Sequence, residues 1–221
     1  MICLLVMTDG RGDCLHDTMI SAADSLRGPV TRWLIHDDSG DEDYSRWLRA
    51  RYSEWEIVST PGRSGFGGAI RSAWSYIAGR AERFVFHLED DFTFRRPVDL
   101  AAMAEVLYAR PYLMQLALRR QPWNDAEHLA GGIVEQHPED FTEVTDPTGK
   151  TWLEHRRFFT TNPSLYRSEL CRQPWPRGPE SEGHFTHQLL ASPAVRFGYW
   201  GAMASGEAVT HIGHERIGTG Y

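Results

Sequence analysis

The sequence predicts a single α/β domain in which a mostly parallel sheet is flanked by helices. Two observations support this prediction. Apolar runs of strand length alternate with segments of helical spacing through the first half of the chain, and this alternation is typical of βαβ units. Acidic residues follow three of the apolar runs, and open α/β sheets bind ligands at the carboxyl ends of their strands. A length of 221 residues suffices for one well-buried core.

The first half of the chain predicts four strands joined by helical crossovers. After the first strand, apolar residues recur at helical spacing from Met19 to Leu26, and Gly28 followed by Pro29 ends the helix. Such crossovers join parallel strands with a right-handed connection. The expected strands span residues 2–7, 31–36, 55–59 and 84–88, and the expected helices span 16–26, 44–52 and 69–78.

The second half is less regular. A helix is expected at 99–108, a strand at 113–118, a return to the core at 158–167, a helix at 182–191, and late strands at 195–199 or 208–211. Residues 119–157 are polar and rich in glycine and proline. This composition predicts a long functional loop region, called the excursion below, that contains a short hairpin. Trp123 and Trp152 in this excursion are candidates for stacking on an acceptor sugar, although either indole could instead serve the core.

Composition excludes several classes of function. The formal net charge of -7 argues against broad nucleic-acid binding, which needs a positive surface. Three widely spaced cysteines give neither a disulfide framework nor a zinc site, and reduced thiols fit a cytoplasmic protein. No apolar run reaches the roughly 20 residues of a membrane span, and the apolar N-terminus is too short for a signal peptide. A cytoplasmic location is therefore expected.

The most informative segment is RFVFHLEDDFTF, residues 83–94. An apolar strand ends directly in Glu89, Asp90 and Asp91, whose mutual repulsion calls for a compensating cation. Carboxylate oxygens suit Mg²⁺ or Mn²⁺, which commonly hold the phosphates of a substrate. The alternative interpretation is a solvated acidic turn.

Acids also follow the first two strands. Asp9 comes after the first strand, and Asp37 and Asp38 end the second. Each alone could be a turn or helix-cap residue. Together with the acids at 89–91 they lie along one edge of one sheet, which favours a binding site at that edge.

The segment GRSGFGG, residues 62–68, precedes a predicted helix. Glycines allow a ligand to approach the backbone closely, and a helix N-terminus favours phosphate. No Gly-Lys-Ser/Thr follows, so the segment is not a Walker loop. It also comes too late in the chain for the dinucleotide fingerprint of a first βα turn.

The order of these motifs resembles the GT-A glycosyltransferases, and in particular their inverting family 2-like branch. The resemblance is carried by IHDDSGD after the second strand, by Gly67 and Arg71 in the third crossover, and by LEDDF after the fourth strand. It covers residues 2–94 and resumes at the C-terminus. Glu89 departs from the usual DxD motif, whose first acid is aspartate. The resemblance implies a nucleotide-binding half, 1–94, and an acceptor- and metal-completing half, 95–221, with a flexible C-terminal tail.

The resemblance also implies residue roles. A divalent cation, Mn²⁺ or Mg²⁺, would be held by Asp91, with Glu89, His211 and His214 as further candidate ligands. The positions implied to bind the nucleotide-sugar donor are Thr8, Asp9, Gly10, Arg11, Asp37, Asp38, Arg63, Gly67, Arg71, Glu89, Asp90, Asn162 and Arg216.

A catalytic base is expected in the segment GPESEGHFTHQLL, residues 178–190, which resembles the family region where an acid begins a helix near the sugar. Glu182 is the first candidate and Glu180 the second. The alternative is that these acids only complement a helix N-terminus. The resulting prediction is a metal-dependent, inverting transferase that moves a sugar from a UDP-linked donor to a carbohydrate or other hydroxyl acceptor. The competing hypotheses are a sugar nucleotidyltransferase and a non-catalytic carbohydrate- or nucleotide-binding module.

Overall fold

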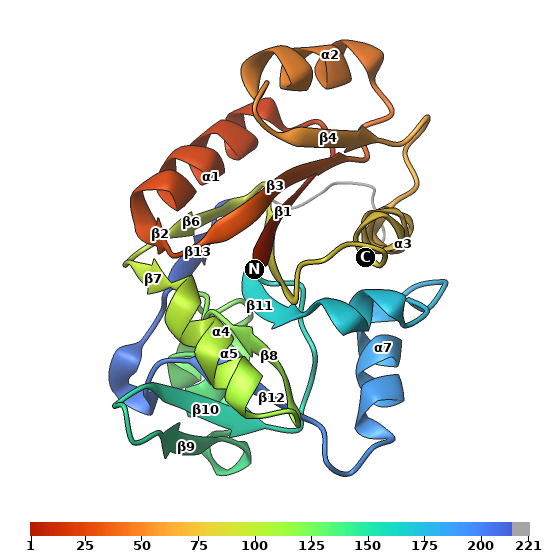
Figure 1. Ribbon diagram of the computed structural model, residues 1–221. Helices are drawn as coiled ribbons and strands as arrows, with labels where there is room; N and C mark the ends of the chain where they lie inside the picture. Colours follow the sequence, from red (N-terminus) through yellow and green to blue (C-terminus); the bar gives the residue numbers. More distant parts are fainter. Residues whose placement is uncertain (214–221) are drawn as a thin grey trace.

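The computed structural model describes residues 1–213 of the chain (Figure 1). The strands are β1 (Ile2–Thr8), β2 (Leu26–Arg27), β3 (Val30–Asp37), β4 (Glu56–Ser59), β5 (Phe84–Glu89), β6 (Phe92–Phe94), β7 (Val98–Asp99), β8 (Leu113–Ala117), β9 (Thr142–Thr145), β10 (Thr151–His155), β11 (Ser164–Arg167), β12 (Arg196–Trp200) and β13 (Val209–His211). The α-helices are α1 (Gly12–Ser25), α2 (Glu42–Arg51), α3 (Phe66–Ile77), α4 (Leu100–Ala109), α5 (Asp125–Ala130), α6 (Ile133–Gln136) and α7 (Ser181–Leu190).

A nine-stranded sheet in the order β4-β3-β1-β5-β11-β8-β12-β10-β9 crosses the whole molecule. Its first four strands pair in parallel, which confirms the βαβ arrangement that the first half of the sequence predicts. The register places Thr8 beside Asp37, and Met7 beside Glu89. The acidic strand ends therefore lie along one edge of the sheet, as the sequence indicated.

Helices cover both faces of the sheet. Successive strand residues point to opposite faces, so Leu4 and Val6 of β1 pack with α1, α2 and α4, whereas Cys3 and Leu5 pack with α3 and α7. Both faces are apolar because both are covered, and this produces the continuous hydrophobic runs of β1 and β5.

The first residues of several helices differ from the predictions. The first helix begins at Gly12 rather than at residue 16. Asp41 caps α2 by accepting hydrogen bonds from the backbone N–H groups of Asp43 and Tyr44. Asp99 caps α4 in the same way instead of being its first helical residue. Apolar periodicity shows only the part of a helix that meets the core, and so it does not show the polar first turn of α2, which begins with Glu42 and Asp43.

The second half mixes pairing directions. Strand β11 runs antiparallel to both β5 and β8, and β8 and β12 are parallel. The predicted hairpin exists as β9 and β10, and it extends the main sheet through β12. Both proposed late strands form, as β12 and β13. The short helices α5 and α6 were not predicted, because segments of six and four residues carry little periodicity.

The hypothesis that Trp152 stacks on a sugar is wrong. Its side chain lies in the core and is 0% exposed, and the guanidinium of Arg110 lies 4.2 Å from the centre of its ring. Strand β10 carries Trp152 on the sheet face that packs against α4, where the indole fills the core.

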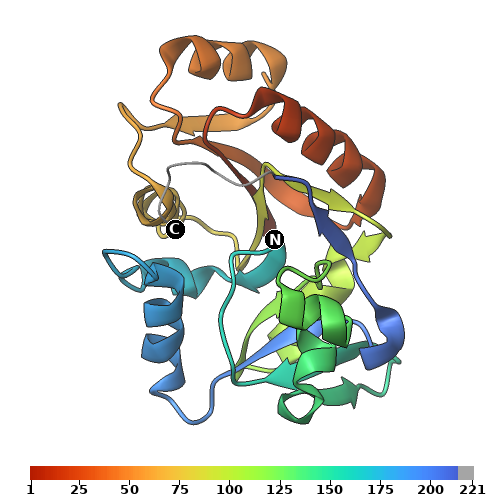
Figure 2. The ribbon, with the colours of Figure 1, turned by 180° about the vertical axis from the view of Figure 1, so that it is seen from behind.

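A small second sheet brings the end of the described chain to the acidic edge. Strand β13 pairs antiparallel with β6, and the register sets His211 opposite Phe92, directly after Asp91 (Figure 2). The backbone N–H of Ile212 also donates to the carbonyl of Asp91 at 2.7 Å. Residues about 120 positions apart in the sequence thus become neighbours.

Candidate active site

A cavity of about 1080 Å³ opens at the carboxyl end of the parallel strands. Its wall is formed by the glycine-rich loop before α3, the end of β5, the segment 158–162, the first turn of α7 and β13. The predicted site residues that line it are Arg11, Gly67, Arg71, Glu89, Asp91, Asn162, Glu180, Glu182 and His211. The structure therefore gathers candidate donor, metal and catalytic residues from both halves of the chain.

Arg11 is the cation that the acidic strand ends require. Its guanidinium pairs with Asp9 at 3.1 Å, with Asp91 at 2.6 Å and with Asp90. Burial alone would lower the pKa of Arg11, but the charges of Asp90 and Asp91 outweigh burial and raise it. The guanidinium therefore remains charged, and it balances part of the negative charge of the acids.

Asp90 faces inward. One of its carboxylate oxygens accepts a hydrogen bond from the Thr8 hydroxyl at 2.7 Å, and its backbone carbonyl accepts one from Thr18 at 2.8 Å. Burial raises the pKa of Asp90 to about 7, although Arg11 and Thr8 oppose this shift. Asp90 thus ties the acid site to β1 and α1, and it does not line the cavity.

Asp91 and His211 lie as close together as two ligands of one metal ion would. The Asp91 Oδ2 atom lies 3.0 Å from His211 Nε2, and neighbouring ligands of an octahedral ion at about 2.1 Å are also about 3 Å apart. Asp91 Oδ1 is buried and has no hydrogen-bond partner within residues 1–213. Burial opposes ionisation of Asp91, but His211 and Arg11 outweigh it and lower the pKa of this carboxyl.

Glu89 does not complete this pair. It lines the same cavity. Within the described residues, however, the ligand atoms of Glu89, Asp91 and His211 do not all lie within 4.8 Å of one another. The remaining positions on a bound cation would therefore fall to substrate phosphates and water, the arrangement that Mg²⁺ commonly adopts. His214 and Arg216, also predicted at this site, lie outside the described residues.

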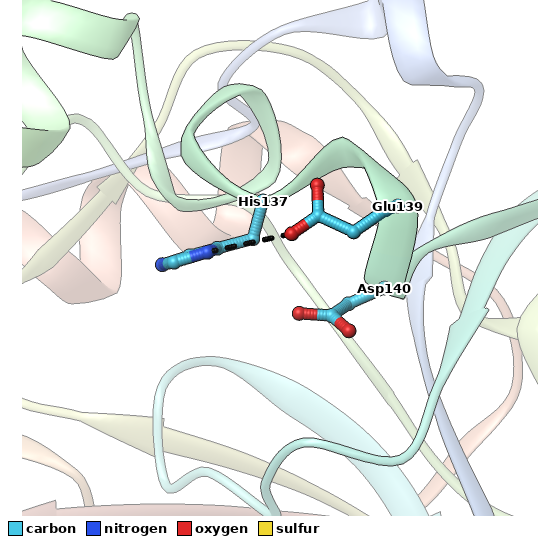
Figure 3. A group of neighbouring side chains, drawn as sticks. All are labelled: His137, Glu139 and Asp140. Atoms are coloured by element: carbon cyan, nitrogen blue, oxygen red, sulfur yellow. Dashed lines mark ion pairs between the residues drawn. The ribbon is translucent and has the colours of Figure 1, made fainter.

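A second group of potential ligands lies elsewhere. His137, Glu139 and Asp140 gather where α6 meets the following turn, and their ligand atoms lie within 4.8 Å of one another (Figure 3). Glu139 and Asp140 are exposed, and Asp140 pairs with Arg157. None of the three lines the cavity.

Asp37 and Asp38 serve the frame of the site and do not line its cavity. Asp37 is 0% exposed, and its carboxylate accepts hydrogen bonds from Ser39 N–H at 2.9 Å and from the Ser45 hydroxyl at 2.5 Å. Both oxygens of Asp37 are therefore engaged within the protein, and its contact with a nucleotide stays a prediction.

Asp38 anchors the glycine-rich loop. Its carboxylate accepts hydrogen bonds from the Ser64 N–H at 3.0 Å, the Ser64 hydroxyl at 2.5 Å and the Thr60 hydroxyl at 2.9 Å. Direct contact of Asp38 with a nucleotide remains a prediction, whereas its hold on the loop is observed.

The glycine-rich loop needs its glycines for different reasons. Gly65 precedes α3 with a φ of 70°, which favours glycine. A side chain on Gly68 would place its Cβ 2.6 Å from Ser64, while one on Gly67 would approach Arg71 to 3.3 Å. Arg71 itself donates to the carbonyl of Pro176 at 3.1 Å, which fixes its guanidinium at the cavity wall.

The first βα loop is tied to the same region. Gly10 has a φ of 106°, and a Cβ there would approach Ser39 to 3.3 Å. The Arg63 guanidinium donates to the carbonyl of Asp9 at 2.8 Å. These predicted donor positions therefore brace the loop that carries Arg11, and neither Gly10 nor Arg63 lines the cavity.

Glu182 lines the same cavity and is held in place by Thr161. Its Oε2 atom accepts hydrogen bonds from both the backbone N–H of Thr161, at 2.8 Å, and the Thr161 hydroxyl, at 2.7 Å. Burial raises the pKa of Glu182 to about 7, although the bonds from Thr161 oppose the shift. A carboxylate with a pKa near neutrality suits general-base chemistry. Glu180 is exposed at the same rim and has a left-handed backbone with a φ of 54°.

Sequence analysis missed the polar support around Trp123. The indole lines the cavity and is 56% exposed, and its ring lies 4.9 Å from that of His211. Glu127 accepts hydrogen bonds from the Trp123 backbone N–H at 3.0 Å and from Arg120 at 2.8 Å. No sequence signal identified Arg120 or Glu127, because their pairing depends on the fold of the excursion.

No profile of a known protein family and no curated protein sequence matches the chain. Solved structures do match it in three dimensions. A fragment of TarS from S. aureus, residues 1–349 with UDP-GlcNAc, matches with a TM-score of 0.66 and 16% identity, over 97% of this chain and 59% of that one. GalNAc-T7 with UDP, GalNAc and Mn²⁺ matches with a TM-score of 0.62 and 10% identity, over 98% of this chain and 44% of that one.

A third match is CMP:2-keto-3-deoxy-manno-octonic acid synthetase with CTP. It has a TM-score of 0.55 and 12% identity, and the match covers 94% of this chain and 92% of the synthetase. The first two proteins are glycosyltransferases, and the third is a synthetase in complex with CTP. This chain spans less than two thirds of either glycosyltransferase chain.

The sheet, the acidic strand ends and these matches define the class: the chain has the GT-A fold of nucleotide-sugar glycosyltransferases. At identities of 10–16% the likeness establishes the fold alone. Within residues 1–213 no helix has both the length and the apolar character needed to cross a membrane.

Proposed function

We propose that this protein is a metal-dependent glycosyltransferase that moves a sugar from a UDP-linked donor to an acceptor hydroxyl with inversion. One observation carries the proposal. The Asp91–His211 pair and Glu182 line one cavity, so a leaving-group site and a basic carboxylate face the same space. The UDP-sugar and UDP complexes of the two glycosyltransferases with this fold support the choice of donor.

The donor diphosphate belongs at the acidic edge. Asp91 and His211 would hold a divalent cation there, and that ion would neutralise the negative charge of the departing diphosphate. Arg71, fixed at the wall by Pro176, adds a positive charge to the same cavity. The helix N-terminus behind Gly65 provides further electrostatic complementarity to phosphate.

The acceptor belongs between Glu182 and Trp123. The two hydrogen bonds from Thr161 fix one oxygen of Glu182, and this orients the carboxylate. As a base, Glu182 would take the acceptor proton while the acceptor oxygen attacks the anomeric carbon from the side opposite the diphosphate. This single displacement would invert the anomeric configuration.

The proposal is tested by binding followed by turnover. Purified protein is heated with UDP, UDP-GlcNAc, UDP-Gal or UDP-Glc, in Mn²⁺ or in EDTA, and its melting temperature is recorded. A donor at 100 times its Kd should add about 2.7 kcal/mol to the free energy of unfolding. The stabilising donor is then incubated with candidate acceptors, and UDP release and sugar transfer are measured. If no nucleotide sugar stabilises the protein and none releases UDP, the proposal is contradicted.

The match to the CTP-bound synthetase favours one alternative function, sugar nucleotidyl transfer. This chain would then transfer the nucleoside monophosphate part of a nucleoside triphosphate to a sugar acid or sugar phosphate and release inorganic diphosphate. The discriminating measurement is diphosphate release from CTP or UTP with such a sugar. The segment TDGRGDCLHDT contains Gly10, Arg11 and Gly12, but only residues 9–11 connect β1 to α1. It is a poor match to the glycine-rich, arginine-containing loop usual in that class, which places glycosyl transfer first.

Trp123→Ala should weaken acceptor use more than donor binding. The exposed indole offers an apolar face beside Glu127 and Arg120, and an aromatic contact contributes about 0.5–1.5 kcal/mol. We expect the acceptor KM to rise about three- to tenfold, with the Kd of UDP unchanged. Trp33→Ala is the matched control, because Trp33 is 44% exposed and does not line the cavity. Equal effects of the two substitutions would argue against an acceptor role for Trp123.

A further inference from the structure

Arg11 occupies the place where a cation would bind. Three of its guanidinium nitrogens each contact a different acid: Nε meets Asp9, one terminal nitrogen meets Asp90, and the other meets Asp91 Oδ2 at 2.6 Å. The side chains of Asp90 and Asp91 are only 1% and 2% exposed. Solvent therefore does little to screen these two acids, and Arg11 is the cationic side chain that contacts both of them among the described residues.

The same Asp91 oxygen serves two groups. Oδ2 accepts from Arg11 and also lies 3.0 Å from His211 Nε2, the proposed second ligand. The backbone of Gly213 closes over this oxygen: a side chain there would collide with Asp91 Oδ2 and place its Cβ 3.0 Å from Arg11. Arg11, His211 and the backbone of Gly213 therefore already surround Oδ2, and a divalent ion bound there would compete with the guanidinium.

We infer that Arg11 is an exchangeable counter-ion: it neutralises Asp90 and Asp91 when no divalent cation is bound, and Mn²⁺ or Mg²⁺ reaches Asp91 only by displacing its guanidinium. This inference rests on the proposed function for the identity of the cation site. One positive charge faces up to three carboxylates, so a doubly charged ion compensates them better. Arg11 already lines the cavity, so a displaced guanidinium enters the space proposed for the diphosphate, which arginine can bind in a bidentate manner.

The exchange predicts that one substitution raises the affinity for Mn²⁺ and lowers the affinity for UDP. Arg11→Met keeps the aliphatic stem but removes the competing charge. Mn²⁺ alone, titrated by calorimetry without nucleotide, should bind this variant about tenfold more tightly than the parent, as expected if about 1.4 kcal/mol of ion pairing no longer has to be broken. At saturating Mn²⁺, UDP should bind about tenfold more weakly, because the guanidinium that binds diphosphate is gone.

Two further variants make the test specific. Arg46→Met removes the same charge from an exposed arginine that pairs with Asp43 and does not line the cavity, so Mn²⁺ affinity should stay within about threefold. Arg11→Lys retains the charge but cannot contact Asp90 and Asp91 with two planar nitrogens. It should therefore also bind Mn²⁺ more tightly than the parent, even if Arg11→Met proves too unstable to study.

The outcomes separate this inference from the proposed function. Unchanged or weaker Mn²⁺ binding by both Arg11 variants would overturn the exchange, even if the parent protein transfers sugar. If neither the parent nor any variant binds Mn²⁺, the exchange is overturned as well. The transfer assay would then show independently whether the proposed function survives. Tighter Mn²⁺ binding together with weaker UDP binding supports the exchange.

Discussion

Asp91→Asn should lower the rate of sugar transfer by about two to four decades, which corresponds to about 3–5 kcal/mol of lost transition-state stabilisation. The carboxylate is 2% exposed and is shared between Arg11 and His211. Asparagine keeps the shape but removes the negative charge that holds the cation, and with it the neutralisation of the leaving diphosphate. The measurement is the initial rate of transfer at saturating donor across a Mn²⁺ titration.

A surface substitution controls for charge. Asp17→Asn changes an exposed acid on α1 and should leave the transfer rate and its Mn²⁺ dependence unchanged. His211→Ala should resemble Asp91→Asn but with partial rescue by excess Mn²⁺, because one of two ligands remains. Near-normal turnover of Asp91→Asn at saturating Mn²⁺ would remove Asp91 from the metal site.

Glu182→Gln should lower transfer by about 10²- to 10⁴-fold, the usual contribution of a general base. Glutamine keeps the size of the side chain, and its oxygen can still accept the hydrogen bonds from Thr161, but it cannot take a proton at neutral pH. Donor binding in Mn²⁺ should stay within a few-fold of the parent, since Glu182 acts on the acceptor. Glu180→Gln is the matched control, two residues away on the same rim.

The pH profile gives a second signature of Glu182. Burial raises its pKa to about 7, and a base is active when it is deprotonated. The rate of transfer should therefore be constant above pH 7 and fall about tenfold for each pH unit below it. Glu182→Gln should remove this dependence. If both glutamine variants transfer at the parental rate, the base lies elsewhere or the reaction retains configuration, and NMR of the new anomeric proton decides which.

The ionisation of Glu182 also bears on folding. Its folded-state pKa, about 7, is above the unfolded value of about 4.3. Folding stability attributable to this group is therefore lost as pH rises from about 4 to 7. Glutamine mimics the protonated form, so Glu182→Gln should melt no lower than the parent at pH 8. This result would show that its lost activity is not a loss of fold.

The sequence by itself determined the frame of the molecule. Strands such as Phe84–Glu89 are recognisable locally, because a strand buried on both faces must be apolar along its length. The acids that follow such strands meet at one edge, because parallel strands share their direction. The assignment of Asp91 and Glu182 to one site came from the resemblance to the GT-A glycosyltransferases, and the structure places both residues on the same cavity.

Only the tertiary structure decided how these groups are partnered. His211 reaches Asp91 through the pairing of β13 with β6, and Thr161 reaches Glu182 across 21 residues. Long-range pairing of this kind leaves no periodic trace in the sequence, so Arg11 could be named as a site residue but not as the counter-ion of Asp90 and Asp91. Burial distinguished the two tryptophans of the excursion. Trp152 lies on a sheet face that α4 covers and is buried in the core, whereas Trp123 lies in the loop before α5 and is exposed at the cavity.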